Sequence, residues 1–390
     1  MRRIPLAIAL VSLISLAGCS KKLVIGVVLP ETGESSEYGA SIKTGVKLAF
    51  DEAMTAKTAP EGLQVIYRDS GSDPARAVSE QEALYDEGAL VIIGGATTEE
   101  AKAMVAVADK RERILISPSA SAPDLARQSV YFFRVYPSDD FEGVTASDIL
   151  YQTRGVRRVL ILQQDNAYTR GLLTVFMGAY KSAGGEIVGT VRIGDPGWEK
   201  EARDVIAAHQ PGGVYVCGYG EAILNGLRFL RGIGYGGQGE TICTTSAINT
   251  AQFLQQAGNL AEGVFFPLAG FDPTSKKEPV ATFVRRYYDV YQLTPDVYAA
   301  HGFDAALVAL EGIRNLKTHS AGEIQIKLKG LGEMQGVTGF LAFDDYGNIK
   351  HYPKAHWVHD GKVEDFNAYI EGEKDRLRRK WEQMVLEGGR

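Results

Sequence analysis

A loop rich in hydroxyl groups follows a short apolar run, and it holds side chains suited to binding a ligand. Ile114–Ile116 leads into the loop Ser117–Asp124, which contains several serines and two prolines and no obvious catalytic base. If the run is a buried strand of an open α/β sheet, this loop lies at the carboxyl end of the strand, where ligands bind. Hydroxyls and backbone N–H groups can hold an anion by hydrogen bonds. The alternative is an ordinary strand-to-helix connection with a serine cap.

The chain lacks the sequence motifs of common enzymes. Residues 232–237 match the letters GxGxxG, but they follow a predicted helix and precede a predicted strand, the reverse of a dinucleotide-binding turn. We interpret this segment as a helix stop. There is no P-loop lysine after spaced glycines, no GxSxG elbow, no HExxH and no paired CxxC. We therefore expect a protein that is not an enzyme and needs no cofactor.

Histidines and one buried acid are the remaining candidates for chemistry. His351, His356 and His359 lie close to Asp360 in a strand-like segment. They could bind a metal, but histidines scattered over a surface explain the pattern more simply, so we expect no metal site. Asp304 stands in an apolar helical stretch, where its carboxylate either faces a cleft or serves as a buried cap or hinge contact.

The residues around the hydroxyl loop predict a repeating order of strand and helix. Leu23–Leu29 is an apolar run without alternation, as expected for a strand covered on both faces, and Tyr38–Met54 has apolar residues at helical spacing. The same order continues with a strand at Leu63–Tyr67, a helix at Pro74–Glu87, a strand at Leu90–Ile93, a helix at Glu99–Lys110 and a strand at Ile114–Ile116. This order is typical of a doubly wound parallel sheet.

The order then starts again in the second half of the chain. Strands are expected at Val159–Leu162, Glu186–Ile193, Val214–Val216 and Thr241–Cys243, with helices at Arg170–Lys181, Trp198–His209 and Glu221–Arg231. Asp73-Pro74 in the first half and Asp195-Pro196 in the second precede matching helices. We infer one α/β lobe made twice, although βαβ units of unrelated origin also look alike.

Three extended segments separate the predicted lobes. Phe132–Ser138, Gly263–Pro267 and Gly336–Phe343 each cross between the two halves, so we expect a three-segment hinge with a cleft beside it. Further helices are predicted at Pro279–Tyr291 and Tyr298–Leu316, a turn at Asp344–Asn348, and a charged helical tail at Glu371–Met384.

The first residues look like a lipoprotein signal. Arg2 and Arg3 precede an apolar run that ends near Ala17 and is too short for a comfortable membrane span. Gly18 and Cys19 follow at the spacing of a bacterial lipidation motif, so we expect Cys19 to carry the lipid. The alternative is a plain signal peptide with an incidental cysteine. No second apolar run of membrane length follows, so the lipid is the expected membrane contact.

The composition limits the class of protein further. The formal net charge is −6, and Lys and Arg form no stripe interleaved with aromatic residues, so we expect no nucleic-acid partner. The ~370 residues after the signal exceed one comfortable core, which predicts two lobes. Cys217 and Cys243 end strand-like runs, and neighbouring parallel strands seldom offer disulfide geometry. We expect two buried free thiols, although an exported protein permits a disulfide.

A set of short stretches, taken in order, resembles the leucine/isoleucine/valine-binding protein family. These proteins are type I periplasmic binding proteins of ABC importers, and the resemblance runs from about Leu23 to about Phe366. No single stretch is decisive, but the ordered set is quite specific. The stretches are Ile25–Gly33, Tyr38-Gly39, Gly45–Glu52, Asp69, Asp73-Pro74, Ile92–Thr98, Ser117–Asp124, Gly218-Tyr219, Ala261–Val264 and Tyr298–Ala305.

The resemblance implies a ligand site between the lobes. In amino-acid-binding members, hydroxyls and N–H groups after two adjacent strands of the first lobe hold the ligand carboxylate. Thr98, with Thr97 beside it, matches the first of these positions, and Ser119 and Ser121 match the pair in the second loop. Three tyrosines match aromatic positions that close over the ligand: Tyr38, Tyr168 and Tyr219.

The second lobe departs from the family pattern. Relatives that bind amino acids usually place a Glu or Asp after the strand that follows the Tyr219 helix, where it pairs with the ligand ammonium. This chain has Thr245 and Ser246 there, and Ser246 is the expected ligand contact. A buried ammonium without a carboxylate is costly. Either Glu221 or Asp304 replaces the missing acid, or the ligand is an organic acid, aromatic or not, without an ammonium.

These observations lead to one set of expectations. The fold is α/β, with two similar doubly wound lobes joined by three segments, as in type I periplasmic binding proteins. Its function is that of a monomeric, lipid-anchored solute-binding protein on the periplasmic side of a bacterial envelope, presenting a small carboxylate-bearing ligand to the permease and ATPase subunits of an ABC importer. A ligand-sensing subunit of the same fold, feeding a signalling partner, is the alternative. The expected parts are residues 1–19 as signal and lipobox, 23–136 with 268–337 as the N-terminal lobe, 137–267 with 338–366 as the C-terminal lobe, and 367–390 as a charged tail.

Overall fold

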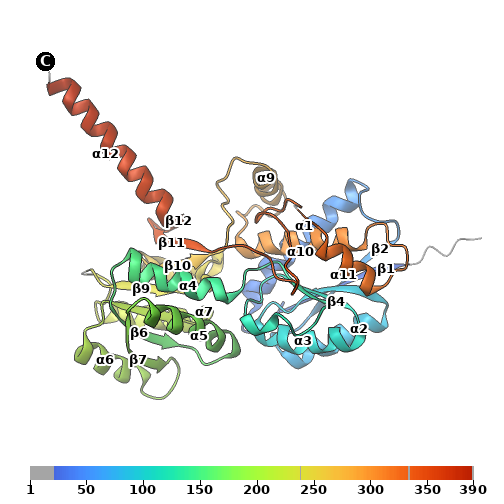
Figure 1. The fold of residues 1–390 in the computed structure, drawn as a ribbon, viewed down its shortest axis with the longest axis horizontal. Coiled ribbons are helices and arrows are strands. Elements are labelled where there is room, and N and C mark those ends of the chain that lie inside the picture. Colours follow the sequence, from blue (N-terminus) through green and yellow to red (C-terminus); the bar gives the residue numbers. More distant parts are fainter. Residues whose placement is uncertain (1–21, 238, 333, 389–390) are drawn as a thin grey trace, which may run out of the picture.

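The computed structural model describes residues 22–237, 239–332 and 334–388, with the two sheets and their helices side by side (Figure 1). The expected signal segment and Cys19 lie outside the described residues. Within them the chain forms two α/β lobes, as the alternation of strands and helices predicts.

The first lobe is built on a parallel sheet. In the part of the chain that the structure describes, five strands form it in the order β2-β1-β3-β4-β5. Apolar residues without alternation leave β1 buried along its whole length. The strands are β1 (Leu23–Leu29), β2 (Leu63–Asp69), β3 (Ala89–Gly94), β4 (Ile114–Ser117) and β5 (Phe132–Arg134). The helices are α1 (Ser36–Thr55), α2 (Pro74–Asp86), α3 (Thr98–Arg111), α9 (Val280–Tyr291), α10 (Val297–Ile313) and α11 (Ala321–Lys329), with a short 3₁₀ turn at Pro123–Leu125.

The second lobe repeats this plan and extends it. Its described strands lie in the order β7-β6-β8-β9-β10-β11-β12, and the last two run antiparallel to their neighbours. The strands are β6 (Arg158–Gln163), β7 (Glu186–Arg192), β8 (Gly213–Cys217), β9 (Thr241–Thr244), β10 (Phe265–Leu268), β11 (Lys354–His359) and β12 (Lys362–Asp365). The helices are α4 (Asp139–Asp148), continued by a π-helical turn at Ile149–Thr153, α5 (Ala167–Ser182), α6 (Trp198–His209), α7 (Gly220–Gly232) and α8 (Ala251–Ala257), with 3₁₀ turns η3 (Ser246–Ile248) and η4 (Gly258–Ala261).

The two sheets share one strand order. β2-β1-β3-β4-β5 in the first lobe corresponds to β7-β6-β8-β9-β10 in the second. This correspondence confirms the predicted duplication and the predicted fold class. In such sheets the crevice for a ligand opens where the strand order reverses, here beside β1 and β3 and beside β6 and β8. The loops after these strands therefore face one another across the space between the lobes.

Helix α4 is the main element that sequence reasoning missed, because no helix was predicted between the crossing Phe132–Ser138 and the strand at Val159–Leu162. Ser138 caps the helix by accepting the backbone N–H of Asp140 at 3.3 Å. Asp139, Asp140 and Glu142 fill its first turn, where acidic side chains are favoured by the helix dipole. A capping serine followed by acids is a helix-start signal, so the sequence did carry the information.

The lobes are joined by three stretches of chain. The chain leaves the first sheet between β5 and α4, returns between β10 and α9, and crosses again between α11 and β11. The third crossing is held to the first, because the N–H of Arg134 donates to the carbonyl oxygen of Gly347 at 2.9 Å. Asp304 of α10 also holds this crossing, since it accepts the N–H groups of Val337 and Thr338, both at 2.9 Å.

Two glycines let α10 approach α1 closely. A Cβ atom at Gly45 of α1 would collide with the backbone of Ala299, and one at Gly302 of α10 would collide with the backbone of Ile42. Only glycine fits both positions without moving a helix. The contact fixes the start of α10, which carries Tyr298, against the first lobe.

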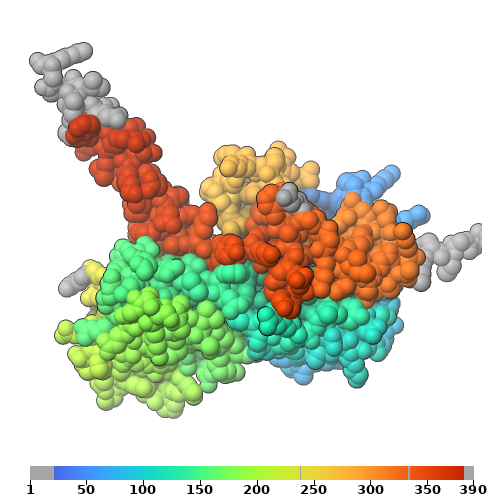
Figure 2. Space-filling model, viewed as in Figure 1, coloured from blue at the N-terminus to red at the C-terminus, as the bar shows by residue number. Residues whose placement is uncertain are grey.

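The last helix, α12 (Phe366–Gly388), projects away from the body of the molecule (Figures 1 and 2). Its described surface carries ion pairs at i,i+3 spacing, such as Glu373 with Arg376 and Asp375 with Arg378. These pairs agree with the predicted charged tail. Among the described residues, no helix is both long and apolar enough to cross a membrane.

Candidate functional site

A small pocket lies between the lobes, at the carboxyl ends of the parallel strands of both sheets. It is lined by Tyr38, Ala96, Thr97, Ser119, Ser121, Tyr136, Tyr168, Tyr219, Ser246, Ala247 and Tyr298. Its volume is about 20 Å³, room for about one water molecule. The structure is therefore a closed form, and a ligand of several heavy atoms enters only when the lobes separate or the tyrosines move.

The first lobe contributes neutral hydrogen-bonding groups. Thr97 caps α3 by accepting the N–H of Glu100 at 3.2 Å. Because Thr97 also lines the pocket, the N-terminus of α3 lies beside the pocket. The hydroxyl of Ser119 donates to the carbonyl oxygen of Ala96 at 2.6 Å, tying the two loops together. Thr98 is 1% exposed, and its hydroxyl has no partner among the described residues. Hydroxyls, N–H groups and a helix N-terminus suit an anion.

Tyrosines from both lobes fill most of the pocket. The hydroxyl of Tyr38, from the first lobe, donates to the carbonyl oxygen of Ala247 at 3.1 Å and accepts the N–H of Gly220 at 3.2 Å, both in the second lobe. The rings of Tyr168 and Tyr219 stack with centroids 4.7 Å apart. Burial raises the pKa of Tyr219 well above its ordinary range, while the nearby N–H of Thr98 lowers it. All these phenols are therefore neutral donors and acceptors.

Hydrogen bonds at the rim also join the lobes. The N–H of Ala167, at the start of α5, donates to Oε1 of Glu99 at 2.6 Å. The hydroxyl of Thr250 donates to Oε2 of Glu37 at 3.2 Å, and Nε2 of Gln164 donates to Oε1 of Glu34 at 3.2 Å. These contacts form only when the lobes are shut.

The second lobe presents a carboxylate that sequence reasoning did not identify. Glu142 of α4 is 2% exposed and accepts the N–H of Ser246 at 2.9 Å and its hydroxyl at 2.8 Å. The hydroxyl of Tyr168 donates to the same carboxylate at 3.3 Å. Burial raises the pKa of Glu142, while these hydrogen bonds lower it. An acid thus stands directly behind two residues that line the pocket.

A second acid, Asp139, lies one helical turn before Glu142. It is 0% exposed, and neither of its carboxylate oxygens has a hydrogen-bond partner of good geometry among the described residues. Burial raises the pKa of Asp139 well above its ordinary range and the charge of Glu142 adds to this effect, whereas the hydroxyl of Ser121 and the charge of Arg134 lower it. Burying both carboxylates in their ionised form lowers the stability of the fold unless a proton or a cation neutralises part of their charge.

Most of the residues expected at the site meet in this pocket. Tyr38, Thr97, Ser119, Ser121, Tyr168, Tyr219 and Ser246 all line it. Thr98 lies buried beside Thr97 at the start of α3. Thr245 is turned away, because its hydroxyl donates to the carbonyl oxygen of Gly218 at 3.0 Å.

The two acids considered as replacements for the missing one lie elsewhere. Glu221 is exposed on α7 and pairs with Arg228 at 2.7 Å. Asp304 is fully buried at the hinge, where it also accepts the hydroxyl of Thr338 at 2.7 Å. Burial raises the pKa of Asp304 to about 6, and the contacts from Thr338 and Val337 oppose the shift. Neither lines the pocket.

Two further tyrosines complete the pocket. Tyr136 belongs to the first crossing and Tyr298 to the first turn of α10, and their rings stack with centroids 6.2 Å apart. His301 packs on Tyr136 with centroids 4.7 Å apart, and burial lowers the pKa of His301 to about 3, so the ring is neutral. Packing of the crossings turns both tyrosines into the pocket, and no local sequence pattern marks them as site residues.

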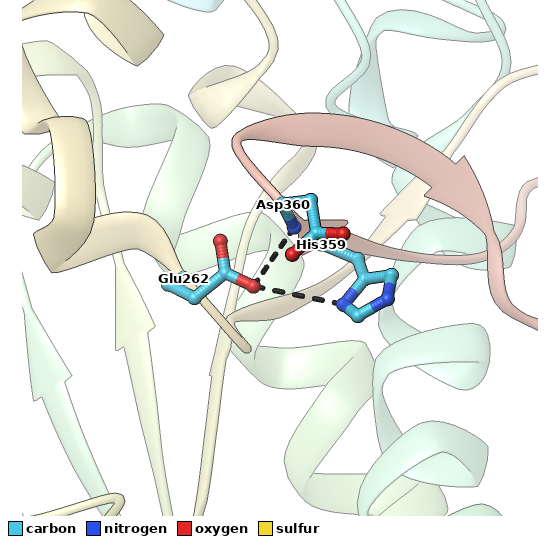
Figure 3. Close-up of side chains that lie close together, drawn as sticks. All are labelled: Glu262, His359 and Asp360. Atoms are coloured by element: carbon cyan, nitrogen blue, oxygen red, sulfur yellow. Dashed lines mark hydrogen bonds and ion pairs between the residues drawn. The ribbon is translucent and has the colours of Figure 1, made fainter.

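The acid and histidine cluster at the edge of the second lobe has a structural explanation (Figure 3). The carboxylate of Glu262 accepts the N–H groups of Asp360 and Gly361 at 3.0 and 3.1 Å, in the turn between β11 and β12. Nδ1 of His359 lies 3.6 Å from Oε1 of Glu262. The cluster is largely exposed, and Glu262 serves as the cap of this turn.

The two cysteines of the second lobe are buried free thiols, as expected. Cys217 ends β8, and Cys243 lies in β9. Burial raises the pKa of both thiols, so they are unreactive core residues.

Comparison of the chain with known proteins gives a consistent result. A family model described as periplasmic binding protein matches residues 22–353. Leu/Ile/Val-binding protein homolog 2 of Brucella abortus (strain 2308) is 23% identical over 370 residues, which are 92% of this chain and 97% of that protein. The leucine-, isoleucine-, valine-, threonine-, and alanine-binding protein of Pseudomonas aeruginosa is 22% identical over 361 residues, 90% of this chain and 94% of that one.

Solved structures share the architecture. The branched-chain amino acid transporter substrate binding protein LivJ from Streptococcus pneumoniae, in complex with isoleucine, aligns with a TM-score of 0.79 and 27% identity, over 88% of this chain and 98% of that one. A solute binding protein of an ABC transporter from R. palustris, in complex with benzoate, aligns with a TM-score of 0.76 and 19% identity, over 89% and 96% of the two chains. The second likeness concerns the fold alone.

Proposed function

The chain belongs to the periplasmic binding protein family, and we propose that it is the lipid-anchored solute-binding protein of an ABC importer, binding a small carboxylate-bearing ligand between its lobes. Its relatives are binding proteins rather than enzymes. One observation carries the proposal: hydroxyls of the first lobe and tyrosines of both lobes converge on a single pocket at the sheet crevice.

The first lobe supplies the groups that would hold the carboxylate. Thr97, Ser119 and Ser121 line the pocket, and α3 begins there with its N-terminus. A carboxylate held by such donors needs no buried counter-charge from the protein. Each charge-assisted hydrogen bond contributes about 1.5–3 kcal/mol, so a few of them with apolar burial reach the ~8 kcal/mol of micromolar binding.

Closure of the lobes would couple binding to transport. Tyr38 reaches across the cleft to Ala247 and Gly220, and the pocket is fully formed only when both lobes take part. A ligand that contacts both lobes binds the closed form more tightly and shifts the population toward it. The permease subunits would then recognise the closed form. Lipidation at Cys19 would keep the protein at the membrane on the periplasmic side, beside its permease and ATPase partners.

Removal of the serine hydroxyls of the first lobe tests this proposal. Ser119→Ala combined with Ser121→Ala should weaken binding of amino acids or of simple carboxylic acids, whichever the protein binds, by at least about tenfold, because a charge-assisted hydrogen bond is lost. The melting temperature should fall only slightly, because one hydrogen bond between the loops, from Ser119 to the carbonyl oxygen of Ala96, is lost as well. Calorimetric titration and thermal unfolding measure the two effects. A large fall in melting temperature with unchanged affinity would show that these serines only support the loop.

A further inference from the structure

A second hollow lies in the second lobe, away from the cleft. Its volume is about 310 Å³, and three arginines line it, Arg154, Arg157 and Arg158. The lining residues lie directly before strands β6, β8 and β9 or begin them, so the hollow is at the amino ends of these strands. The pocket between the lobes is at their carboxyl ends, one strand length, or ~15 Å, away. The two sites are therefore separate.

The arginines reach the hollow together because they share one short connection. They fall within five residues, between the π-helical turn after α4 and strand β6. Arg158 begins β6, and the pairing of Val159 with Gly213 in β8 places it beside Gly212. A Cβ atom at Gly212 would meet Val156 at 3.9 Å and nothing nearer. The missing side chain therefore leaves open space beside Arg158.

Contacts with the protein hold Arg154 and Arg157 in place. Nε of Arg154 donates to the hydroxyl of Thr241 at 3.4 Å, and its guanidinium lies 4.8 Å from the ring centre of Phe265. Nη1 of Arg157 donates to the carbonyl oxygen of Tyr151 at 2.7 Å, and its guanidinium lies 3.9 Å from the ring centre of the same tyrosine. Such contacts reduce the conformational entropy that each side chain loses when it binds a ligand.

Most of the hydrogen-bonding capacity of these arginines is unused. Nη2 of Arg158 donates to the carbonyl oxygen of Gln210 at 3.4 Å. Within the part of the chain that the structure describes, each of the three arginines thus donates from one nitrogen and keeps two nitrogens without a protein partner. A guanidinium carries five N–H donors in a planar fork. The remaining donors are available to a ligand.

The positive charge of this connection has no acidic partner among the described residues. The three arginines donate to backbone carbonyls and one hydroxyl, and none of them forms an ion pair with a described carboxylate. Glu186 of β7 lies opposite Arg158 in the sheet register, yet the two side chains do not form an ion pair. Arg170 and Arg192 of the same lobe, in contrast, both pair with Asp165. Like charges this close repel one another, and a bound anion would relieve the repulsion.

We propose that Arg154, Arg157 and Arg158 form a binding site for a phosphate group, carried either by a soluble compound or by the headgroup of a lipid. Guanidinium groups bind phosphate oxygens through two parallel N–H bonds, and several of them match its double negative charge. The hollow is larger than one phosphate group, so the phosphate would belong to a larger molecule. This site goes beyond the proposed function, since it is separate from the cleft that would hold the transported solute.

Titration with phosphate compounds tests the site. The purified full-length protein is titrated by calorimetry at constant ionic strength with pyrophosphate, glycerol 3-phosphate and dihexanoyl phosphatidylglycerol. The lipid is kept below its critical micelle concentration, so that insertion of a lipid anchor cannot contribute. We expect at least one probe to bind with a Kd below about 1 mM. Arg158→Gln should weaken this binding by at least about fivefold, because charge-assisted hydrogen bonds are lost. Arg154→Gln, a second variant in the same hollow, should do the same.

Arg203→Gln is the matched control. It removes the same charge from an exposed arginine of α6 that also contacts an aromatic ring, that of Phe229, and lies outside the hollow. It should leave the binding unchanged. Tighter binding of the lipid would identify a headgroup as the source of the phosphate, and equal or tighter binding of the soluble compounds would identify a soluble source; either result supports the site. Equal weakening by Arg203→Gln, or no binding of any probe, would overturn it and leave the proposed function untouched.

Discussion

Helices α10 and α4 occupy matching positions in the two lobes, yet they place different side chains near the cleft. α4 follows the first crossing and α10 follows α9 after the second, and each packs along the helix that follows the first strand of its lobe, α10 along α1 and α4 along α5 (Figure 1). The first turn of α10 offers the phenol of Tyr298, and one turn later the neutral His301 is buried. The first turns of α4 bury Asp139 and Glu142.

This difference shows how a duplicated fold acquires a polar cleft. The equal strand order of the two sheets brings equivalent loops to the crevice from both sides. The repeated strand order alone does not make one side of the cleft chemically different from the other. The difference comes from α10, which brings the neutral Tyr298 to the pocket, and from α4, which buries Glu142 behind the pocket-lining residues Tyr168 and Ser246.

The largest expected effect concerns Asp304, the acid of α10. It tests whether this acid stabilises the fold rather than contacting the ligand. Asp304→Ala leaves the N–H groups of Val337 and Thr338 and one hydroxyl without their acceptor. Unsatisfied buried donors should lower the free energy of unfolding by about 3 kcal/mol. Urea unfolding measures this loss, and Asp345→Ala, at an exposed neighbouring position, is the control. A change of ligand preference in a stable Asp304→Ala protein would place Asp304 at the site instead.

The next effect concerns Asp139 of α4. Its pKa is raised by burial, so the native state holds the proton more tightly than the unfolded state. The stability that this group contributes is greatest below its ordinary pKa of ~3.9 and is lost as the pH rises toward the raised value. Asp139→Asn should therefore match the wild type at pH 3.5 and be more stable by about 1–2 kcal/mol at pH 7.5. Lower stability of Asp139→Asn at both pH values would show that attraction to Arg134 dominates.

The sequence predicted the lobes and most of the pocket because both depend on local pattern. Buried strands such as Leu23–Leu29 are apolar throughout, and the hydroxyl loops follow them directly. The acids of α4 were not predicted, because the identity of Glu142 as a site residue depends on its contact with Ser246, which is 104 residues away. Tyr136 and Tyr298 were missed for the same reason: packing of the crossings, not local pattern, turns them into the pocket.

The smallest expected effect concerns Glu221, an acid of the second lobe outside the pocket. It is exposed and pairs with Arg228. Exposed ion pairs contribute little, so Glu221→Ala should change the free energy of unfolding by less than about 0.5 kcal/mol. Thermal unfolding and ligand titration check this. A clear loss of ligand affinity would place Glu221 at the ligand site.

The central claim is that the cleft between the lobes holds a small carboxylate-bearing ligand. The most direct measurement is mass spectrometry of the small molecules released when the purified protein is denatured. We expect a compound that carries a carboxylate, present in wild-type protein and depleted in the protein with Ser119→Ala and Ser121→Ala. Release of a compound without a carboxylate, in equal amount from both proteins, would contradict the claim.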